Sequence, residues 1–184
     1  DPLRYYLIKE VSFGNDGNIS QERLEDCINS DLANNYGNLC QRVTAFTIKN
    51  CKGKIPDKIE FQKEDLDILN KYKDNLDNIR LKIDHQNINF YIDFIVNSLF
   101  EANKYFNDQE PWKKKDDITR LNTIVFTSLE IIRKISFLLY PIIPGSVLKA
   151  LKIFNLDENQ IKLEDISKNE FLIKGNSINK IDIL

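Results

Sequence analysis

Trp112, the only tryptophan of the chain, stands in a stretch that suits the binding of an unstacked nucleobase. It follows Pro111 directly and precedes three lysines, Lys113, Lys114 and Lys115. Because proline fixes φ, the backbone at this point is stiff. A rigid aromatic ring beside cations favours base stacking together with phosphate contacts. The alternative interpretation is structural: the indole covers the end of a helical bundle, and the lysines belong to a solvated loop.

Asn38 and Arg42 are a second candidate for recognition chemistry. They are four residues apart, so on a helix both side chains project from the same side. Asparagine offers a donor and an acceptor, and arginine offers a rigid fork of donors. Such a pair matches the Watson–Crick edge of a base in single-stranded RNA. From spacing alone, a solvated helix face with Arg42 paired to a local carboxylate is the simpler explanation.

The composition limits the classes of function. The chain has 184 residues and a formal net charge of -2, which fits one domain of ordinary size. Because the chain as a whole is not basic, any site for a polyanion must be a local patch. His85 is the only histidine, which argues against histidine-based metal sites and most histidine-dependent catalytic triads.

Cysteine usage and motif content narrow the classes further. Cys27, Cys40 and Cys51 are odd in number and show no C-x-x-C spacing, which argues against a disulfide framework or zinc and suits the cytoplasm. The sequence shows neither a signal peptide nor an apolar run of about 18 residues, so nothing indicates secretion or a membrane span. Phosphate-cradling and nucleophile motifs are also absent, and no pattern indicates covalent chemistry or a bound cofactor.

Helical periodicity runs through most of the sequence. Residues 1–10 are expected to form a short helix with Leu3, Tyr6 and Leu7 on its apolar side, followed by a glycine-containing loop at 13–18. Further helices are expected at 63–84, 88–107, 117–140 and 146–154. The helix at 117–140 is the most apolar, and its expected inward positions are Ile118, Leu121, Val125, Leu129, Ile132, Ser136 and Leu139.

A long helix is expected between the loop at 13–18 and the Gly53–Pro56 region, with Ser20 or Asn18 as its cap. Its apolar residues follow steps of 4-4-4-3-4-3: Leu24, Ile28, Leu32, Tyr36, Leu39, Val43 and Phe46. The tail from Asp157 is polar and is expected to add a helical turn and a short extended segment. Long helices with short connections pack antiparallel, so the fold class is all-α, a helical bundle of five to six helices.

Four linked motifs then resemble a known family. "DPLRYYLIKEVSFGNDGNIS", "NSDLANNYGNLCQR", "ANKYFNDQEPW" and "YPIIPGS" occur in this order. Together they resemble the C-terminal anticodon-binding domain of the methionyl-tRNA synthetase family over nearly the whole chain. The resemblance implies the anticodon-binding type of bundle found in class I aminoacyl-tRNA synthetases. It also implies that residues 1–19 are a junction helix and loop after an absent catalytic domain, and that residues 20–184 are the anticodon-binding domain.

The resemblance assigns roles to individual residues. In the family, the asparagine and arginine of G-N-L-x-x-R recognise the first anticodon base, a cytosine, and these positions fall on Asn38 and Arg42. The tryptophan of the P-W motif stacks on anticodon bases and falls on Trp112, whose ring Pro111 would hold in place.

Supporting positions and one departure follow from the same comparison of motifs. The N-x-Y pair ahead of P-W falls on Asn103 and Tyr105, which are expected to support the same pocket. The family commonly has an apolar residue after P-W, where this chain has Lys113. The run Lys113–Lys115 is therefore a feature of this sequence, and phosphate contact is its expected role.

The expected partners are a methionine-acceptor tRNA with a CAU anticodon and the missing N-terminal catalytic domain, not DNA or a membrane. The fragment itself is expected to need no cofactor, with ATP and any zinc bound in the missing catalytic part. Two other interpretations remain open. One is the equivalent domain of another class I synthetase, such as the leucyl or cysteinyl enzyme. The other is a helical protein-interaction module in which Trp112 anchors a partner.

Overall fold

The computed structural model describes residues 1–11, 14, 16–17 and 19–181, and within them the fold is an all-α bundle. The expected loop at 13–18 and the end of the expected extended segment lie partly outside these residues. Three consecutive segments, α2 (Gln21–Cys27), η1 (Ile28–Gly37) and α3 (Asn38–Asn50), form one long helix, called the rod. The other helices are α1 (Pro2–Glu10), α4 (Lys63–Asp84), α5 (Ile88–Gln109), α6 (Ile118–Leu139) and α7 (Pro144–Leu151). Counted with the rod as one helix, these make six helices, which confirms the predicted fold class.

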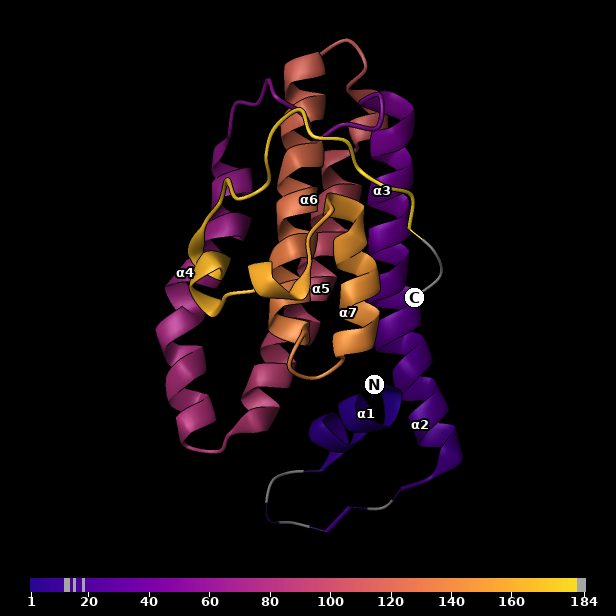
Figure 1. Cartoon of the computed structure of the whole chain (residues 1–184), viewed down its shortest axis with the longest axis vertical. Helices are drawn as coiled ribbons and strands as arrows, with labels where there is room; N and C mark the ends of the chain where they lie inside the picture. The colour runs from indigo at the N-terminus through magenta and orange to yellow at the C-terminus, as the bar shows by residue number, and fades with distance from the viewer. Residues whose placement is uncertain (12–13, 15, 18, 182–184) are drawn as a thin grey trace.

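Helix α6 forms the centre of the bundle (Figure 1). It contacts α3, α4, α5 and α7, and almost every residue along it is buried. Its high apolar content follows directly from this position, because a helix surrounded on all sides has no solvated face. The prediction that Ile118 points inward is wrong, since 58% of this residue is exposed. Ile118 begins the helix, at the end of the bundle, where few neighbours remain to cover it.

The rod formed by α2, η1 and α3 is continuous, because Ile28 and Asn38 at its two junctions keep right-handed helical dihedrals. Ser20 caps its start by accepting a hydrogen bond from the Arg23 amide at 3.2 Å, whereas the other candidate, Asn18, lies outside the described residues. The central segment, η1, is a π-helix of 10 residues. The 4-4-4-3-4-3 spacing predicted a helix over this segment but did not distinguish a π-helix from an α-helix.

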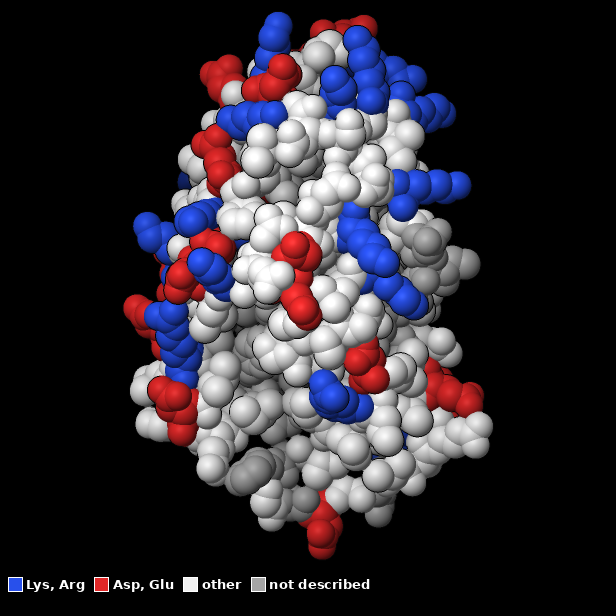
Figure 2. Space-filling model, viewed as in Figure 1, with Lys and Arg blue, Asp and Glu red and all other residues white. Residues whose placement is uncertain are grey.

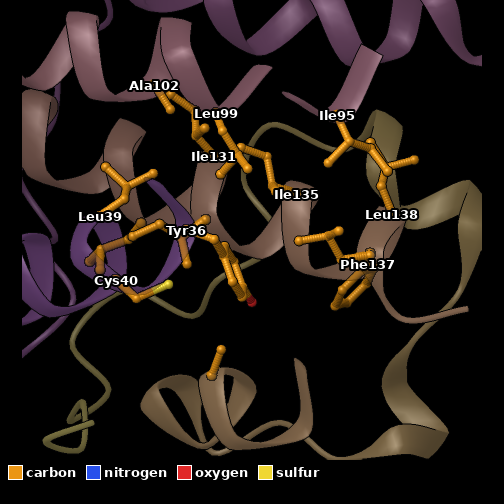
Figure 3. Packing of buried hydrophobic residues seen from close by; sticks show 14 of the residues in the cluster. Tyr36, Leu39, Cys40, Ile95, Leu99, Ala102, Ile131, Ile135, Phe137 and Leu138 are labelled. Carbon is orange, nitrogen blue, oxygen red and sulfur yellow. The ribbon is translucent and has the colours of Figure 1, made fainter. Parts of the chain in front are cut away.

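The core lies where this rod meets α5 and α6. Tyr36, Leu39 and Cys40 of the rod face residues of both helices, including Leu99 and Ile135 (Figure 3). The Tyr36 hydroxyl is hydrogen-bonded to the Ser136 hydroxyl at 2.7 Å, so its polar atom is satisfied although the residue is buried. Cys40 is fully buried and packs here as a small apolar side chain.

Helix α1 buries only part of the predicted face, since Tyr6 is buried as expected and Leu3 and Leu7 are not. Tyr5 and Tyr6 are fully buried, whereas Leu3 is 52% exposed and Leu7 is 36% exposed. The Tyr5 hydroxyl donates to Asp31 Oδ2 at 2.9 Å, and a Lys9 ion pair reaches the same oxygen at 2.7 Å. Asp31 of η1 therefore holds α1 through polar contacts as well as packing. The spacing of apolar residues in a short segment did not reveal these contacts.

The tail folds back over the bundle in short 3-10 turns, η3 (Lys152–Phe154), η4 (Glu158–Gln160) and η5 (Leu163–Ser167). Its expected extended segment forms one antiparallel bridge between Lys54 and Ser177. No helix in the described part of the chain is long and apolar enough to cross a membrane.

Three charged residues of α6, all fully buried, hold this tail. Glu130 Oε1 accepts from two successive tail amides, at 2.6 Å and 2.7 Å. Arg133 donates to the carbonyl oxygens of Asp165 and Lys168 at 3.0 Å and 2.8 Å, and Lys134 Nζ donates to the Ile166 carbonyl oxygen at 2.6 Å. Their charged ends therefore satisfy tail backbone that lies away from water.

Candidate nucleic-acid interface

Trp112 lies on a short, hydrogen-bonded corner between α5 and α6. Glu110 ends α5 in the left-handed conformation, with φ of 44°, and Pro111 opens the 3-10 turn η2 (Pro111–Lys113). The Lys113 amide donates to the Glu110 carbonyl oxygen at 2.8 Å, and the Lys114 amide donates to that of Pro111 at 3.1 Å. The turn thus holds the backbone of Trp112, which is 41% exposed. A half-exposed ring on a fixed backbone matches the geometry of a stacking platform.

Phe106, near the end of α5, connects this corner to α3. Its ring centroid lies 6.1 Å from that of Trp112, with the two planes at 69°. The guanidinium carbon of Arg42 lies 5.6 Å from the same centroid. Phe46 makes a further edge contact at 5.8 Å. Because Phe106 is only 2% exposed, it forms a rigid floor between the arginine and the indole.

Arg42 is held by an uncharged partner. Its Nη2 donates to Asn107 Oδ1 at 2.5 Å, and no carboxylate of the described residues forms an ion pair with it. The simpler explanation offered by spacing, an arginine paired with a local acid, is therefore not what the structure shows. Among the described residues, the position of the guanidinium is defined by Asn107 and the face of Phe106 without an ion pair.

Asn38 and Asn103 lie on the two helices that meet beside Arg42. Asn38 is exposed, one helical turn before Arg42, and it is the first residue of α3 after the π-helix. Asn103 is half-buried, and its Nδ2 lies 3.0 Å from Asn35 Oδ1 and 3.1 Å from the Leu99 carbonyl oxygen. Asn103 therefore ties α5 to the end of the π-helix, just ahead of Asn38.

Tyr105 lies on another side of α5 and is not brought together with Arg42 and Trp112. It is buried, and its hydroxyl donates to Asp65 Oδ1. Burial, together with this hydrogen bond and the Asp65 charge, raises the pKa of Tyr105. Tyr105 therefore contacts the first turn of α4.

The lysine run is exposed at both ends. Lys113 forms an ion pair with Glu110 at 2.7 Å, Lys114 is half-buried and Lys115 is exposed. Figure 2 shows lysine and arginine side chains gathered at the end of the bundle where α3 ends and α6 begins. Acidic side chains lie among these cations in the same view, so the positive charge at this end is local.

Phe106 and Asn107 are site residues that the sequence reasoning missed. Their signal was available, because Asn103, Phe106 and Asn107 stand at i, i+3 and i+4 on one helix and therefore share a side. The aromatic character of Phe106 suggested ordinary core packing, and only its contacts with Arg42 and Trp112 reveal its position between them.

Comparisons with known proteins agree on one family. Residues 1–44 match the family model for class I tRNA synthetases (M). The chain is 36% identical over 167 residues to the methionine–tRNA ligase of Brucella suis biovar 1, which covers 90% of this chain and 32% of that protein. Its identity to the methionine–tRNA ligase of Thermotoga maritima is 34% over 164 residues, covering 88% of this chain and 26% of that protein.

Solved structures give the same result. The crystal structure of the apo form of Mycobacterium tuberculosis methionyl-tRNA synthetase superposes with a TM-score of 0.91 at 32% identity, covering 98% of this chain and 37% of that chain. The same enzyme in complex with methionyl-adenylate gives a TM-score of 0.89. The chain spans about a third of the length of the relatives that it matches. With sequence and fold in agreement, the chain belongs to the methionyl-tRNA synthetase family, in which it corresponds to the C-terminal helical domain.

Proposed function

We propose that this chain is the module with which a methionine–tRNA ligase recognises the anticodon of its tRNA. The observation that carries the proposal is the contact of Arg42 and Trp112 with one ring, that of Phe106. This arrangement holds a fork of donors and a stacking surface beside each other at an exposed corner. An unstacked nucleotide needs both kinds of contact, one for its edge and one for its face.

In this proposal Asn38 and Arg42 read the edge of the first anticodon base, a cytosine in a CAU anticodon, and Trp112 stacks on a base. Pro111 would hold the backbone beside Trp112, and Asn103 would support the residues just ahead of Asn38 through its hydrogen bonds to η1 and α5. Tyr105 would act from the inner side of α5.

The lysines beside Trp112 contribute the sequence-independent part of binding. Lys113, Lys114 and Lys115 would meet phosphates of the anticodon loop, with Lys113 first leaving Glu110. Such contacts release counterions, so affinity falls as salt rises.

The module itself would carry out no chemistry. Its parent enzyme would attach methionine to the tRNA at the expense of ATP, with ATP and any zinc bound in the catalytic domain, to which residues 1–19 would form the junction. Residues 20–184 would then be the anticodon-binding domain proper. The three free cysteines, Cys27, Cys40 and Cys51, support a reducing compartment, the cytoplasm, as its location.

Titration of this chain with tRNA transcripts that differ only in the anticodon tests the proposal. Tighter binding of the CAU transcript, with affinity falling as salt rises, is the expected result. Equal affinity for all anticodons would favour the domain of another class I synthetase. An absence of RNA binding at low salt would instead favour a protein-interaction module.

A further inference from the structure

A buried network lies behind the corner that carries Trp112. Its centre is Asp65, in the first turn of α4, which is fully buried. Asp65 Oδ2 accepts from Arg120 Nη1 at 2.5 Å and from the Gln62 amide at 2.8 Å. Asp65 Oδ1 accepts from Arg120 Nη2 at 3.1 Å and from the Tyr105 hydroxyl. Both carboxylate oxygens are thus engaged with donors from α5, from α6 and from the residue that precedes α4.

The guanidinium of Arg120 extends the network to the end of α5. Its Nη2 also donates to Gln109 Oε1 at 2.6 Å. Gln109 is the last residue of α5, and Arg120 stands in the first turn of α6. The side chain of Arg120 therefore links the end of α5 to the start of α6, the two helices that flank Trp112.

The backbone of the corner is strained, so it needs contacts that hold it in place. Glu110, the residue between Gln109 and Pro111, adopts the left-handed conformation with φ of 44°, which is unfavourable for residues other than glycine. A strained residue persists only where its surroundings determine it. A buried ion pair is weak evidence for stability, since apolar residues of similar volume often replace it without loss. Its better-supported use is to specify one geometry.

We infer that the Asp65–Arg120–Gln109 chain of hydrogen bonds is a positioning device that sets the orientation of Trp112 for base stacking. The inference rests on the proposed function of the corner in RNA recognition. Arginine is required at position 120 because only a planar fork reaches Asp65 and Gln109 together, whereas lysine offers a single point charge. Gln109 is the link that couples the buried pair to the corner.

The variant Gln109→Met tests this link while leaving the Asp65–Arg120 pair in place. Because Trp112 is the only tryptophan, its fluorescence reports on the corner without any RNA. The expected result is a lower steady-state anisotropy and stronger acrylamide quenching of Trp112, together with a 5- to 10-fold loss of affinity for the CAU transcript, about 1 kcal/mol by the usual conversion. The control is Asn97→Met, an exposed position on the same helix.

Arg120→Lys extends the test by keeping the charge and removing the bridge, and it should reproduce the fluorescence change of Gln109→Met if it folds. Unchanged fluorescence and unchanged affinity in Gln109→Met would overturn the inference. Altered fluorescence with unchanged affinity would support the positioning of Trp112 and refute its role in binding. If the unmodified chain binds transcripts with all anticodons equally, the proposed function fails, whereas the fluorescence of Gln109→Met still decides whether the network positions the indole.

Discussion

The Arg42 guanidinium and the Trp112 indole contact the same phenyl ring, that of Phe106, although they come from different elements of the bundle. The distances to its centroid are 5.6 Å from the guanidinium carbon and 6.1 Å from the indole centroid. Because the ring between them is buried, both groups rest against the core of the bundle.

Arg42→Ala should weaken binding to the CAU transcript by about 1–3 kcal/mol and relax the choice at one base. The reason is the loss of a donor fork that forms no ion pair with any carboxylate of the described residues. Parallel titrations with transcripts changed at the first anticodon base measure both effects. Arg80→Ala removes the same charge from α4 and should change neither quantity. Equal losses for all transcripts would show that Arg42 contributes charge but no base recognition.

Trp112→Ala should cost a similar amount of binding, about 1–3 kcal/mol, with little loss of stability. Its ring is 41% exposed, and partly exposed residues carry less packing energy than core residues. Phe106→Ala should instead lower the free energy of unfolding by about 3–5 kcal/mol, because it empties a buried site. Urea unfolding of both variants, followed by RNA titration, separates the two roles. Unfolding of the bundle by Trp112→Ala would show that the indole is a structural cap.

Replacement of Lys113, Lys114 and Lys115 together by glutamine should lower the salt dependence of binding. For single-stranded RNA, the slope of log affinity against log salt becomes shallower by about 0.7 for each phosphate that the protein no longer neutralises. Affinity should fall for all anticodons alike, since phosphate contacts carry no sequence information. The matched control changes three exposed lysines of other elements, Lys73, Lys149 and Lys162, and so has the same net charge. Equal slopes in the two triple variants would contradict a role for the run.

Lys134 should make stability depend on pH. Burial, together with the neighbouring Arg133 charge, lowers the pKa of Lys134 to about 7. Between pH 7 and the ordinary pKa of lysine the unfolded chain binds one more proton than the folded chain does. The free energy of unfolding therefore rises with pH in this interval, by at most about 1.4 kcal/mol per pH unit.

The measurement for Lys134 is urea unfolding between pH 7.0 and roughly 8.5. The free cysteines titrate near pH 8.5 in an unfolded chain, but they are common to the wild type and the variant and cancel in the difference between the two. Lys134→Met lacks the titrating group, so the stability of the wild type relative to this variant should increase with pH. A difference that stays constant across the interval would mean that the buried amine keeps its proton throughout.

Local patterns in the sequence were sufficient for most helices. The helix expected at 63–84 is α4 with the same bounds, and the one expected at 88–107 is α5, which ends two residues later, at Gln109. Periodicity succeeds here because each helix presents one continuous apolar side to the core. It failed for Ile118 and for the buried face of α1, because burial at the end of a helix depends on which neighbours reach it.

In the candidate site, too, some features were readable from the sequence and others only from the tertiary structure. The sequence alone determined the residue types at the corner and on α3, the stiff backbone at Pro111 and the shared side of Asn38 and Arg42, since these depend on spacing within one element. Only the tertiary structure decided that Phe106 joins Arg42 to Trp112 and that Asp65 and Arg120 lie behind them. Contacts between helices depend on rotation and packing of whole elements, which no local pattern specifies.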